Sequence, residues 1–145
     1  MTQVAFHFGA PDKLGYACRL LRKAAASGSR VLVVAQPEEL AQLDSQMWAL
    51  SPTDFVAHCT ASADRAMQQR SPVLLVTQVD STALHQQVLV NLAESVPDHF
   101  EQFERVIEVV SADDSDRDRA RSRWRRYTEL GYTIARHDLT LKGSS

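Results

Sequence analysis

Short apolar runs alternate with amphipathic stretches along most of the chain, a pattern typical of proteins built from interleaved strands and helices. Five short apolar runs predict strands, and the nearly continuous β-branched run at residues 30–35 has the pattern of a strand that is covered on both faces. These runs are residues 4–8, 30–35, 73–77, 88–92 and 105–110. Residues 132–139 alternate more loosely and predict a sixth strand at an edge of the sheet.

Two amphipathic segments in the first third of the chain predict helices. The first has a proline suited to the first helical position, Pro11, and a glycine suited to ending the helix, Gly28. The second begins at Pro37, and two glutamates follow it, as the positive end of the helix dipole favours. Its apolar stripe follows the helical period and consists of Leu40, Leu43, Met47 and Leu50.

A third, more polar helix is predicted near the C-terminal end of the chain. The segment from Ser111 to Asp114 resembles a capping box in which aspartate replaces the usual glutamate. The helix then continues to Leu130, and Gly131 ends it. Between residues 49 and 71 the pattern is weaker, and a short helix is expected there near 63–69. Another short helix is expected at residues 97–103.

The alternation of strands and helices predicts an α/β fold, with one mostly parallel sheet and helices on both of its faces. A length of 145 residues is that of one ordinary domain. The domain is expected to cover residues 1–141, followed by a disordered polar tail at 142–145. No internal repeat or linker-like segment divides the sequence.

The overall composition excludes several classes of protein. With 44% apolar and 23% charged residues, the chain is neither disordered nor of low complexity. It has no apolar stretch of the roughly 18–20 residues that a membrane helix needs, and its N-terminus lacks the basic flank of a signal peptide. Cys18 and Cys59 are expected to be buried thiols of a reducing compartment. A soluble cytoplasmic domain is therefore expected.

Candidate catalytic and cofactor sites are few. The first strand–helix turn, residues 8–13, has one glycine and a proline and matches neither common phosphate-binding loop. The next such turn, residues 35–39, has two acids where a phosphate would lie. His58 and Cys59 are expected in a loop with Asp64 nearby, and their spacing fits neither a metal site nor a nucleophile–base pair. We therefore expect no catalytic residue, no metal and no cofactor.

Arginine usage is the first unusual feature. The net charge is −2, which argues against a general nucleic-acid binder, yet thirteen of the sixteen basic residues are arginine, the residue suited to two-pronged contacts with carboxylates. In the third helix, helical spacing places four residues on one face: Arg117, Arg121, Trp124 and Thr128. This face is suited to hold a carboxylate beside an apolar group. Alternatively, it is a solvated surface stabilised by pairs such as Asp113 with Arg117.

A second unusual feature is a group of large apolar residues in a stretch otherwise typical of loops. Trp48 lies at the end of the second predicted helix, and Pro52, Phe55 and Val56 follow it. These side chains form either a small core beneath a long loop or a docking surface for another protein. The residues alone leave both interpretations open.

Taken in order, several segments resemble the family of chi subunits of bacterial DNA polymerase III. Within residues 43–58, Leu-Asp, Met-Trp, a proline and Phe-Val-Ala-His follow that family's LD…LW…FxPH signature, except that Ala57 stands where many members have proline. Residues 88–100 resemble the family stretch LINL…P..F, and residues 103–131 resemble F.RV.EVV…AR.R…Y…G. The likeness covers almost the full length of the chain.

This resemblance implies a Rossmann-like fold without a functional nucleotide-binding loop, and a non-catalytic accessory role in DNA replication. It also implies two protein partners. One is the psi subunit, which would form a one-to-one heterodimer with this chain and link it to the clamp-loader complex. The other is the acidic C-terminal tail of single-stranded DNA-binding protein, through which the polymerase would be linked to coated lagging-strand template, with DNA contacted mainly indirectly.

The same resemblance assigns the candidate residues to these partners. The implied tail site consists of Arg117, Arg121, Trp124, Val109 and Val110. The implied psi interface consists of Trp48, Pro52, Phe55 and Val56. Two alternatives stay open. One is a direct binder of single-stranded nucleic acid that uses the Arg-rich helix and Trp124 as a stacking platform, and the other is an enzyme with a degenerate nucleotide site.

Overall fold

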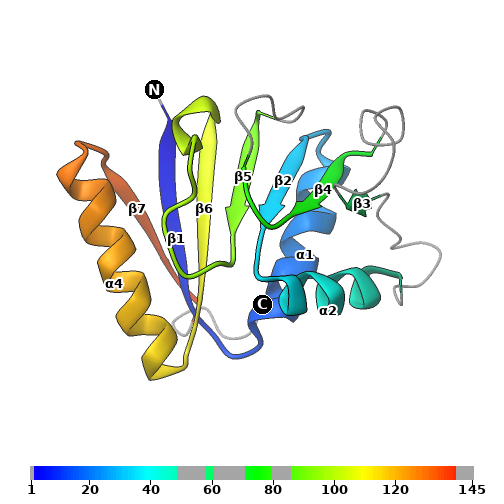
Figure 1. The fold of residues 1–145 in the computed structure, drawn as a ribbon, viewed down its shortest axis with the longest axis horizontal. Coiled ribbons are helices and arrows are strands. Elements are labelled where there is room, and N and C mark those ends of the chain that lie inside the picture. The colour runs from blue at the N-terminus through cyan, green and yellow to red at the C-terminus, as the bar shows by residue number, and fades with distance from the viewer. Residues whose placement is uncertain (1, 49–57, 61–70, 80–85, 140–145) are drawn as a thin grey trace.

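The computed structural model describes residues 2–48, 58–60, 71–79 and 86–139. Its centre is a seven-stranded sheet in the order β3-β4-β2-β5-β6-β1-β7, and all neighbouring strands in it are parallel (Figure 1). The strands are β1 (Gln3–Ala10), β2 (Val31–Val34), β3 (His58–Thr60), β4 (Val73–Val76), β5 (Val88–Asn91), β6 (Arg105–Ser111) and β7 (Ile134–Asp138).

Helices cover both faces of this sheet (Figure 1). α1 (Lys13–Ala26) and α2 (Pro37–Trp48) pack on one face, and α4 (Asp114–Glu129) packs on the other with a short 3-10 helix, η1 (Phe100–Gln102). The predicted α/β fold, with a parallel sheet and helices on both faces, is therefore confirmed. Within the described ranges, no helix has the length and apolarity that crossing a membrane requires.

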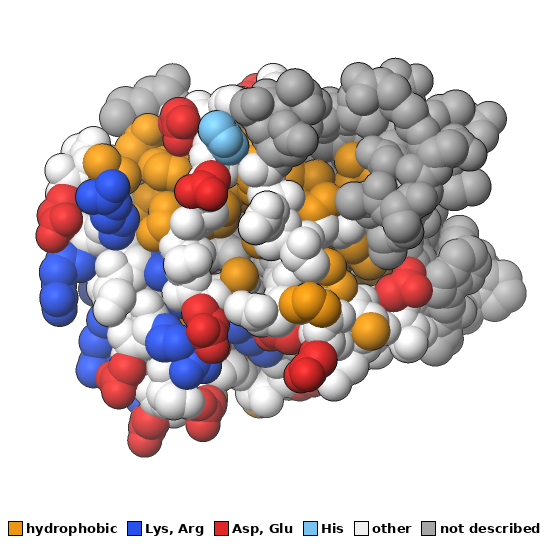
Figure 2. All heavy atoms as spheres, in the orientation of Figure 1, with side chains coloured by type: hydrophobic (Ala, Val, Ile, Leu, Met, Phe, Trp, Pro, Cys, Tyr) orange, Lys and Arg blue, Asp and Glu red, His pale blue; other side chains and the backbone are white. Residues whose placement is uncertain are grey.

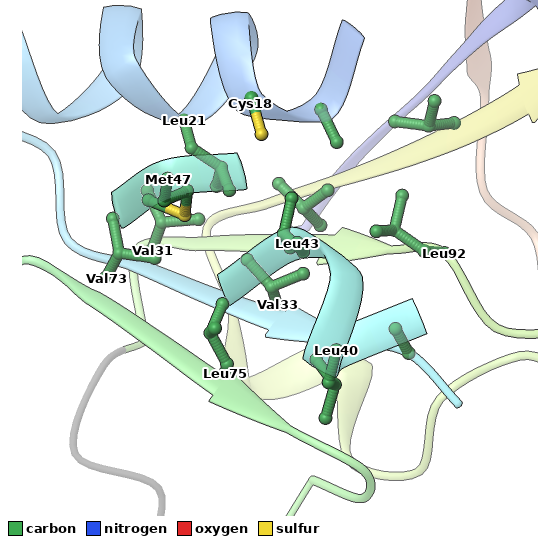
Figure 3. Close-up of a cluster of buried hydrophobic side chains, with 14 of the residues drawn as sticks. Cys18, Leu21, Val31, Val33, Leu40, Leu43, Met47, Val73, Leu75 and Leu92 are labelled. Atoms are coloured by element: carbon green, nitrogen blue, oxygen red, sulfur yellow. The ribbon is translucent and has the colours of Figure 1, made fainter. Parts of the chain in front are cut away.

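The core on the first face consists of the apolar stripes of α1 and α2 against the central strands (Figure 3). Leu21 of α1 and Leu43 and Met47 of α2 are fully buried there, beside Val31 and Val33 of β2. All four residues of β2 are buried, because the strand has a covered face on each side. This burial explains why its sequence is a continuous apolar run.

The core on the second face lies beneath α4. Val4 and Phe6 of β1 and Val106 and Val110 of β6 pack there against Tyr127 of α4, and all five side chains are buried. Burial of such a side chain contributes roughly 1.5–3 kcal/mol to folding. These contacts attach α4 to the strands that lie at one end of the sheet.

The observed start of α1 differs from the predicted start at Pro11, whereas its observed end agrees with the predicted end at Gly28. The carboxylate of Asp12 accepts the N–H of Gly15 at 3.1 Å, which makes Asp12 the N-cap and excludes Pro11 from the helix. At the other end, Gly28 follows the helix with a φ of 86°, a conformation that favours glycine.

The start of α4 is also shifted. Asp113 is its N-cap, because the Asp113 carboxylate accepts the N–H of Asp116 at 3.3 Å. Ser111 belongs to β6 instead, so the predicted capping box is wrong. The predicted end is confirmed, since Gly131 follows the helix with a φ of 93°.

The sequence did not predict β3. His58 and Cys59 were expected in a loop, but they belong to this strand, in which His58 is the register partner of Val73 in β4. Three residues are too few for an alternation pattern, so the strand is defined by its pairing with β4. The expectations for Leu50, Asp64 and the helix near 63–69 lie outside the described residues, as do those for the tail at 142–145.

Candidate functional site

A groove of about 600 Å³ lies between α4 and the strands β6, β1 and β7. We call it the arginine groove, because four of its lining residues are arginine and none is acidic. The lining residues are Phe6, Phe8, Val110, Arg117, Ala120, Arg121, Trp124, Arg125, Thr128 and Arg136.

Strand and helix periodicity explain why these residues meet. Side chains alternate between the two faces of a strand, so Phe6 and Phe8 of β1 lie on the α4 face together with Val110 of β6. Because β7 pairs with β1 in parallel, Arg136 is the register partner of Phe6 and lies on the same face. The α4 residues follow the helical spacing that the sequence predicted, and they border the strands along one side of the helix.

The floor of the arginine groove is apolar. Phe6, Val110 and Ala120 are buried, whereas Phe8 and Trp124 are half-buried. The ring centroids of Phe6 and Trp124 are 5.0 Å apart with an interplanar angle of 58°, so the indole is held against the buried ring. A floor of this kind is suited to an aromatic or aliphatic side chain that displaces water from it.

The rim on the α4 side carries arginines that pair with acids of their own helix. Arg117 lies 3.6 Å from Asp114, and Arg121 lies 2.9 Å from Asp118. These acids stand three residues earlier, so the pairing that the sequence suggested between Asp113 and Arg117 is replaced. The arginine side chains remain 53% and 67% exposed, which leaves them accessible to another carboxylate. Figure 2 shows acidic and basic side chains intermixed on the α4 side of the molecule.

A second set of charged contacts lies beneath α4 and fixes the orientation of the helix. Arg123 donates from Nε to Glu108 at 2.8 Å, and the hydroxyl of Tyr127 donates to the same carboxylate at 2.8 Å. Asn91 of β5 donates to it at 2.9 Å. Burial raises the pKa of Glu108, and the neighbouring Arg123 guanidinium opposes that rise. Arg123 and Tyr127 of α4 are thus both hydrogen-bonded to Glu108 of β6. These bonds fix the orientation of α4, and with it the side chains that α4 directs into the arginine groove.

The N-termini of α1 and α4, where a nucleotide phosphate binds in many α/β proteins, are capped by the chain's own acids. Asp12 caps α1, and Asp113 caps α4. Between them, Asp116 accepts the N–H of Ser111 at 2.8 Å and pairs with Lys13 at 3.3 Å. Each of the two helix N-termini therefore already has a carboxylate acceptor from the chain itself.

The structure brings together most of the residues that were expected to form the tail site. Arg117, Arg121, Trp124 and Val110 all line the arginine groove. Val109 does not, because it is the next residue along β6 and therefore packs on the opposite face, against the α1 and α2 side of the core. The expectation for Val109 is corrected accordingly.

Sequence reasoning missed the contribution of the strands to the groove. Phe6, Phe8 and Arg136 come from β1 and β7, and Arg125 comes from α4. The alternation of Phe6 and Phe8 is visible in the sequence, but only the strand order shows that they lie beside α4. Of the residues expected at the psi interface, Trp48 is the last residue of α2, and Pro52, Phe55 and Val56 lie outside the described residues.

Two histidines that the sequence left unconnected also meet. His7 and His137 are register partners on β1 and β7, with ring centroids 4.5 Å apart, and the Nδ1 atom of His7 is 2.6 Å from the hydroxyl of Tyr16. Among the described residues, no group of three or more His, Cys, Asp or Glu side chains is arranged to hold a metal ion. The imidazole pair is therefore not part of a larger ligand cluster there.

A family model and individual proteins that match this chain all indicate the same family. The family model for "DNA polymerase III chi subunit, HolC" matches residues 1–135. A DNA polymerase III subunit chi of Pseudomonas aeruginosa is 32% identical over 144 residues, which cover 96% of this chain and 98% of that protein. A DNA polymerase III subunit chi of Haemophilus influenzae is 27% identical over 120 residues, which cover 82% of each chain.

A solved structure supports the fold alone. The C-terminal domain of S. cerevisiae Dbp5 (L327V), bound to Gle1 H337R and IP6, matches with a TM-score of 0.61 at 11% identity. The match covers 95% of this chain and 90% of that chain. At this identity the likeness describes the arrangement of helices and strands and nothing about ligands.

Proposed function

The chain belongs to the DNA polymerase III chi subunit (HolC) family, and we propose that, as an accessory subunit of the replicase, it acts without catalysis of its own as an adaptor between two proteins. One partner is the acidic C-terminal tail of single-stranded DNA-binding protein, and the other is the psi subunit. Through psi the chain would be joined to the clamp-loader complex.

The arginine groove is the observation that carries the proposal for the acidic tail. Its floor of Phe6, Val110 and Trp124 suits the side chain of an apolar terminal residue. Its rim of Arg117 and Arg121 offers planar donors for carboxylates of acidic residues that precede that terminus. An acidic peptide with an apolar end is complementary to the groove in both charge and polarity.

The expected affinity is modest and dependent on salt. Exposed ion pairs contribute about 0–1 kcal/mol each, because water and salt screen them. Arg117 and Arg121 already pair with acidic side chains of α4. A carboxylate of the bound tail would therefore replace an existing carboxylate partner of each arginine. Burial of the terminal ring adds roughly 1.5–3 kcal/mol and depends less on salt.

The proposal for psi rests on the family resemblance and on the place of Trp48. This residue ends α2, on the opposite face of the sheet from the arginine groove, and Pro52, Phe55 and Val56 follow it in the sequence. Large apolar residues of this type are frequent anchors of protein interfaces. Two partners on separate faces would bind at the same time, as an adaptor requires.

A titration with two labelled probes tests the proposal. Fluorescence anisotropy is measured for an acidic peptide that ends in Pro-Phe and for a single-stranded oligonucleotide of equal charge. The proposed function predicts binding of the peptide, competition by an unlabelled copy, and little binding of the oligonucleotide. Preferential binding of the oligonucleotide would instead favour a direct binder of single-stranded nucleic acid that stacks bases on Trp124.

A further inference from the structure

The outer side of α1 is basic, although the chain as a whole has a net charge of −2. Residues 13–36 contain five basic residues and no acidic one. Because α1 turns Cys18 and Leu21 into the core, Arg19 and Lys23 lie on its exposed side, about one helical turn apart. Neither side chain forms an ion pair with the described part of the chain. We call these two residues the α1 basic face.

A polar cleft of about 530 Å³ lies at the edge of the sheet where the parallel strands begin, and we call it the amino-edge cleft. α1 leads back to this edge, because it connects the end of β1 to the start of β2. Lys23 lies in the last turn of α1, and Ser29, in the turn that follows, lines the cleft. The other lining residues are Thr2, Gln3, Gln87, Val88, Glu101, Gln102, Phe103, Glu104 and Arg105.

Hydrogen bonds between the starts of the strands hold the amino-edge cleft together. The N–H of Arg30 donates to Oε1 of Gln87 at 2.7 Å, and the N–H of Arg105 donates to the carbonyl of Gln87 at 2.9 Å. The hydroxyl of Thr2 donates to the carbonyl of Phe103 at 2.7 Å. The walls of the cleft are therefore fixed before a ligand arrives, which lowers the entropy cost of binding.

The two sides of the amino-edge cleft differ in charge. Arg105 projects to the α1 side, since Ile107, two residues later in β6, packs in the core on that face. Glu101 belongs to η1 on the other side, and Glu104 is two residues before Val106, which packs there. Both glutamates are exposed, and no basic side chain of the described residues pairs with either. A complementary ligand is anionic at one end and donates hydrogen bonds at the other.

Single-stranded nucleic acid has this combination of properties. Its phosphates would pair with Arg19 and Lys23, while a base with an exocyclic amino group donates from its edge to a carboxylate. Only an unpaired base can leave the strand and present that edge to a cleft. The volume of the cleft is within the roughly 300–1,000 Å³ of sites for small ligands. An acidic peptide, by contrast, supplies the negative charge without the donor end.

We propose that the α1 basic face and the amino-edge cleft bind single-stranded nucleic acid, with phosphates on Arg19 and Lys23 and an amino-bearing base beside Glu101 and Glu104. The α1 basic face is on the opposite side of the sheet from the arginine groove, so the inference goes beyond the proposed function and does not depend on it. Few phosphates are contacted, so the affinity is expected to be weak. Tethering to a coated template would raise the effective concentration of the strand enough to fill such a site.

Anisotropy titrations with labelled oligo(dC) and oligo(dT) of equal length test this inference at low salt. The two strands carry the same charge, but cytosine donates from N4 where thymine has the acceptor O4. The proteins are the unmodified chain, Lys23→Gln, Arg126→Gln, and a chain with both Glu101→Met and Glu104→Met. Arg126 is exposed on α4 and lines neither the cleft nor the arginine groove, so its variant is a control matched in charge.

Each protein should give a distinct result. The unmodified chain should bind oligo(dC) about fivefold more tightly than oligo(dT), at the lower end of what one base contact gives. Lys23→Gln should weaken both strands by the same factor and reduce the slope of log affinity against log salt by about 0.7, as loss of one phosphate contact implies. The double glutamate variant should bind both strands equally. Arg126→Gln should resemble the unmodified chain, and so should the unmodified chain saturated with the acidic peptide ending in Pro-Phe.

Other outcomes would overturn the inference. Absence of binding at low salt, or equal binding of the two strands by the unmodified chain, would exclude the site. A preference for oligo(dC) that persists without the two glutamates would exclude the cleft as the place of the base. Equal losses in Lys23→Gln and Arg126→Gln would mean that only total charge acts, and displacement of the strand by the acidic peptide would place it in the arginine groove. Peptide binding is measured separately, so each of these results leaves the proposed function standing.

Discussion

Arg123 donates to Glu108 at 2.8 Å inside the protein, where the two side chains are only 2% and 0% exposed. Arg123 is one residue from Trp124, and Glu108 is the register partner of Phe6. The buried ion pair is thus next to Trp124 on the helix and to Phe6 on the sheet, and these two residues form part of the apolar floor of the arginine groove. It fixes the rotation of α4 about its own axis, which determines the side chains that border the strands.

Truncation of Arg123 should destabilise the fold strongly. Arg123→Ala leaves the Glu108 carboxylate buried without its guanidinium, and loss of one partner of a buried pair costs about 3–5 kcal/mol. The exposed neighbour provides the control, since Arg126→Ala should change the free energy of unfolding by less than about 0.5 kcal/mol. Urea unfolding measures both. Equal stabilities of the two variants would mean that the pair contributes nothing specific to the fold.

Arg121 should contribute to tail binding through its planar fork. Arg121→Ala should weaken binding of the acidic peptide by about 1.5 kcal/mol, the lower end of the range for hydrogen bonds to charged groups, because Asp118 already occupies it in part. Arg121→Lys should recover only part of the loss, since it keeps the charge without the fork. Titration calorimetry gives these values.

The control for Arg121 is Arg126→Ala, which should leave peptide binding nearly unchanged. Arg119 is less suitable, because it lies 3.7 Å from both Glu94 and Asp116 and its removal disturbs those acids. Equal losses for Arg121→Ala and Arg126→Ala would mean that only the total positive charge of α4 matters.

The two tryptophans should separate the two proposed interfaces. Trp124→Ala removes part of the floor of the arginine groove and should weaken binding of the acidic peptide by roughly 2 kcal/mol, as loss of an aromatic anchor does. Trp48→Ala should leave peptide binding unchanged and weaken the complex with psi by a similar amount. Both complexes are measured for both variants. A loss of peptide binding in Trp48→Ala with a correctly folded protein would contradict the assignment of separate surfaces.

The contact between Lys13 and Asp116 should make stability depend on pH in a defined direction. Burial by itself would raise the pKa of Asp116, but the N–H of Ser111 and the Lys13 ammonium outweigh burial and lower it. The ionised carboxylate therefore stabilises the fold above the usual aspartate pKa of about 3.9, and this contribution is lost as pH falls through the lower value in the folded state.

Asp116→Asn should reveal this contribution. At pH 7 the variant should be less stable than the unmodified chain by about 1 kcal/mol, the difference between a charged and a neutral acceptor. As pH falls from the usual aspartate pKa of about 3.9 through the lower pKa of the folded state, the gap should narrow, because the unmodified carboxyl becomes protonated over that range. Asp114→Asn is the control, since that carboxylate is 96% exposed and its replacement should have little effect at pH 7 or over that range. A gap that widens towards acid would contradict the prediction.

The sequence by itself determined most of the helices and strands and the α4 side of the arginine groove, because both follow from local periodicity. The apolar runs predicted β1, β2, β4, β5 and β6, and the looser alternation at residues 132–139 predicted β7. In β2 the run is continuous because a strand buried on both faces must be apolar throughout. The face shared by Arg117, Arg121 and Trp124 follows from the helical repeat alone, and the three residues do line one groove. Each of these properties depends on residues close together in the chain.

The tertiary structure decided which distant segments meet and which polar residues are buried. Phe6 and Arg136 join the groove only because β1 lies between β6 and β7, an order that no local pattern contains. Arg123 resembles the arginines around it in sequence, yet it is buried, because Glu108 lies opposite it on β6. Strand order and buried pairing depend on contacts far apart in the chain, so periodicity could not predict them.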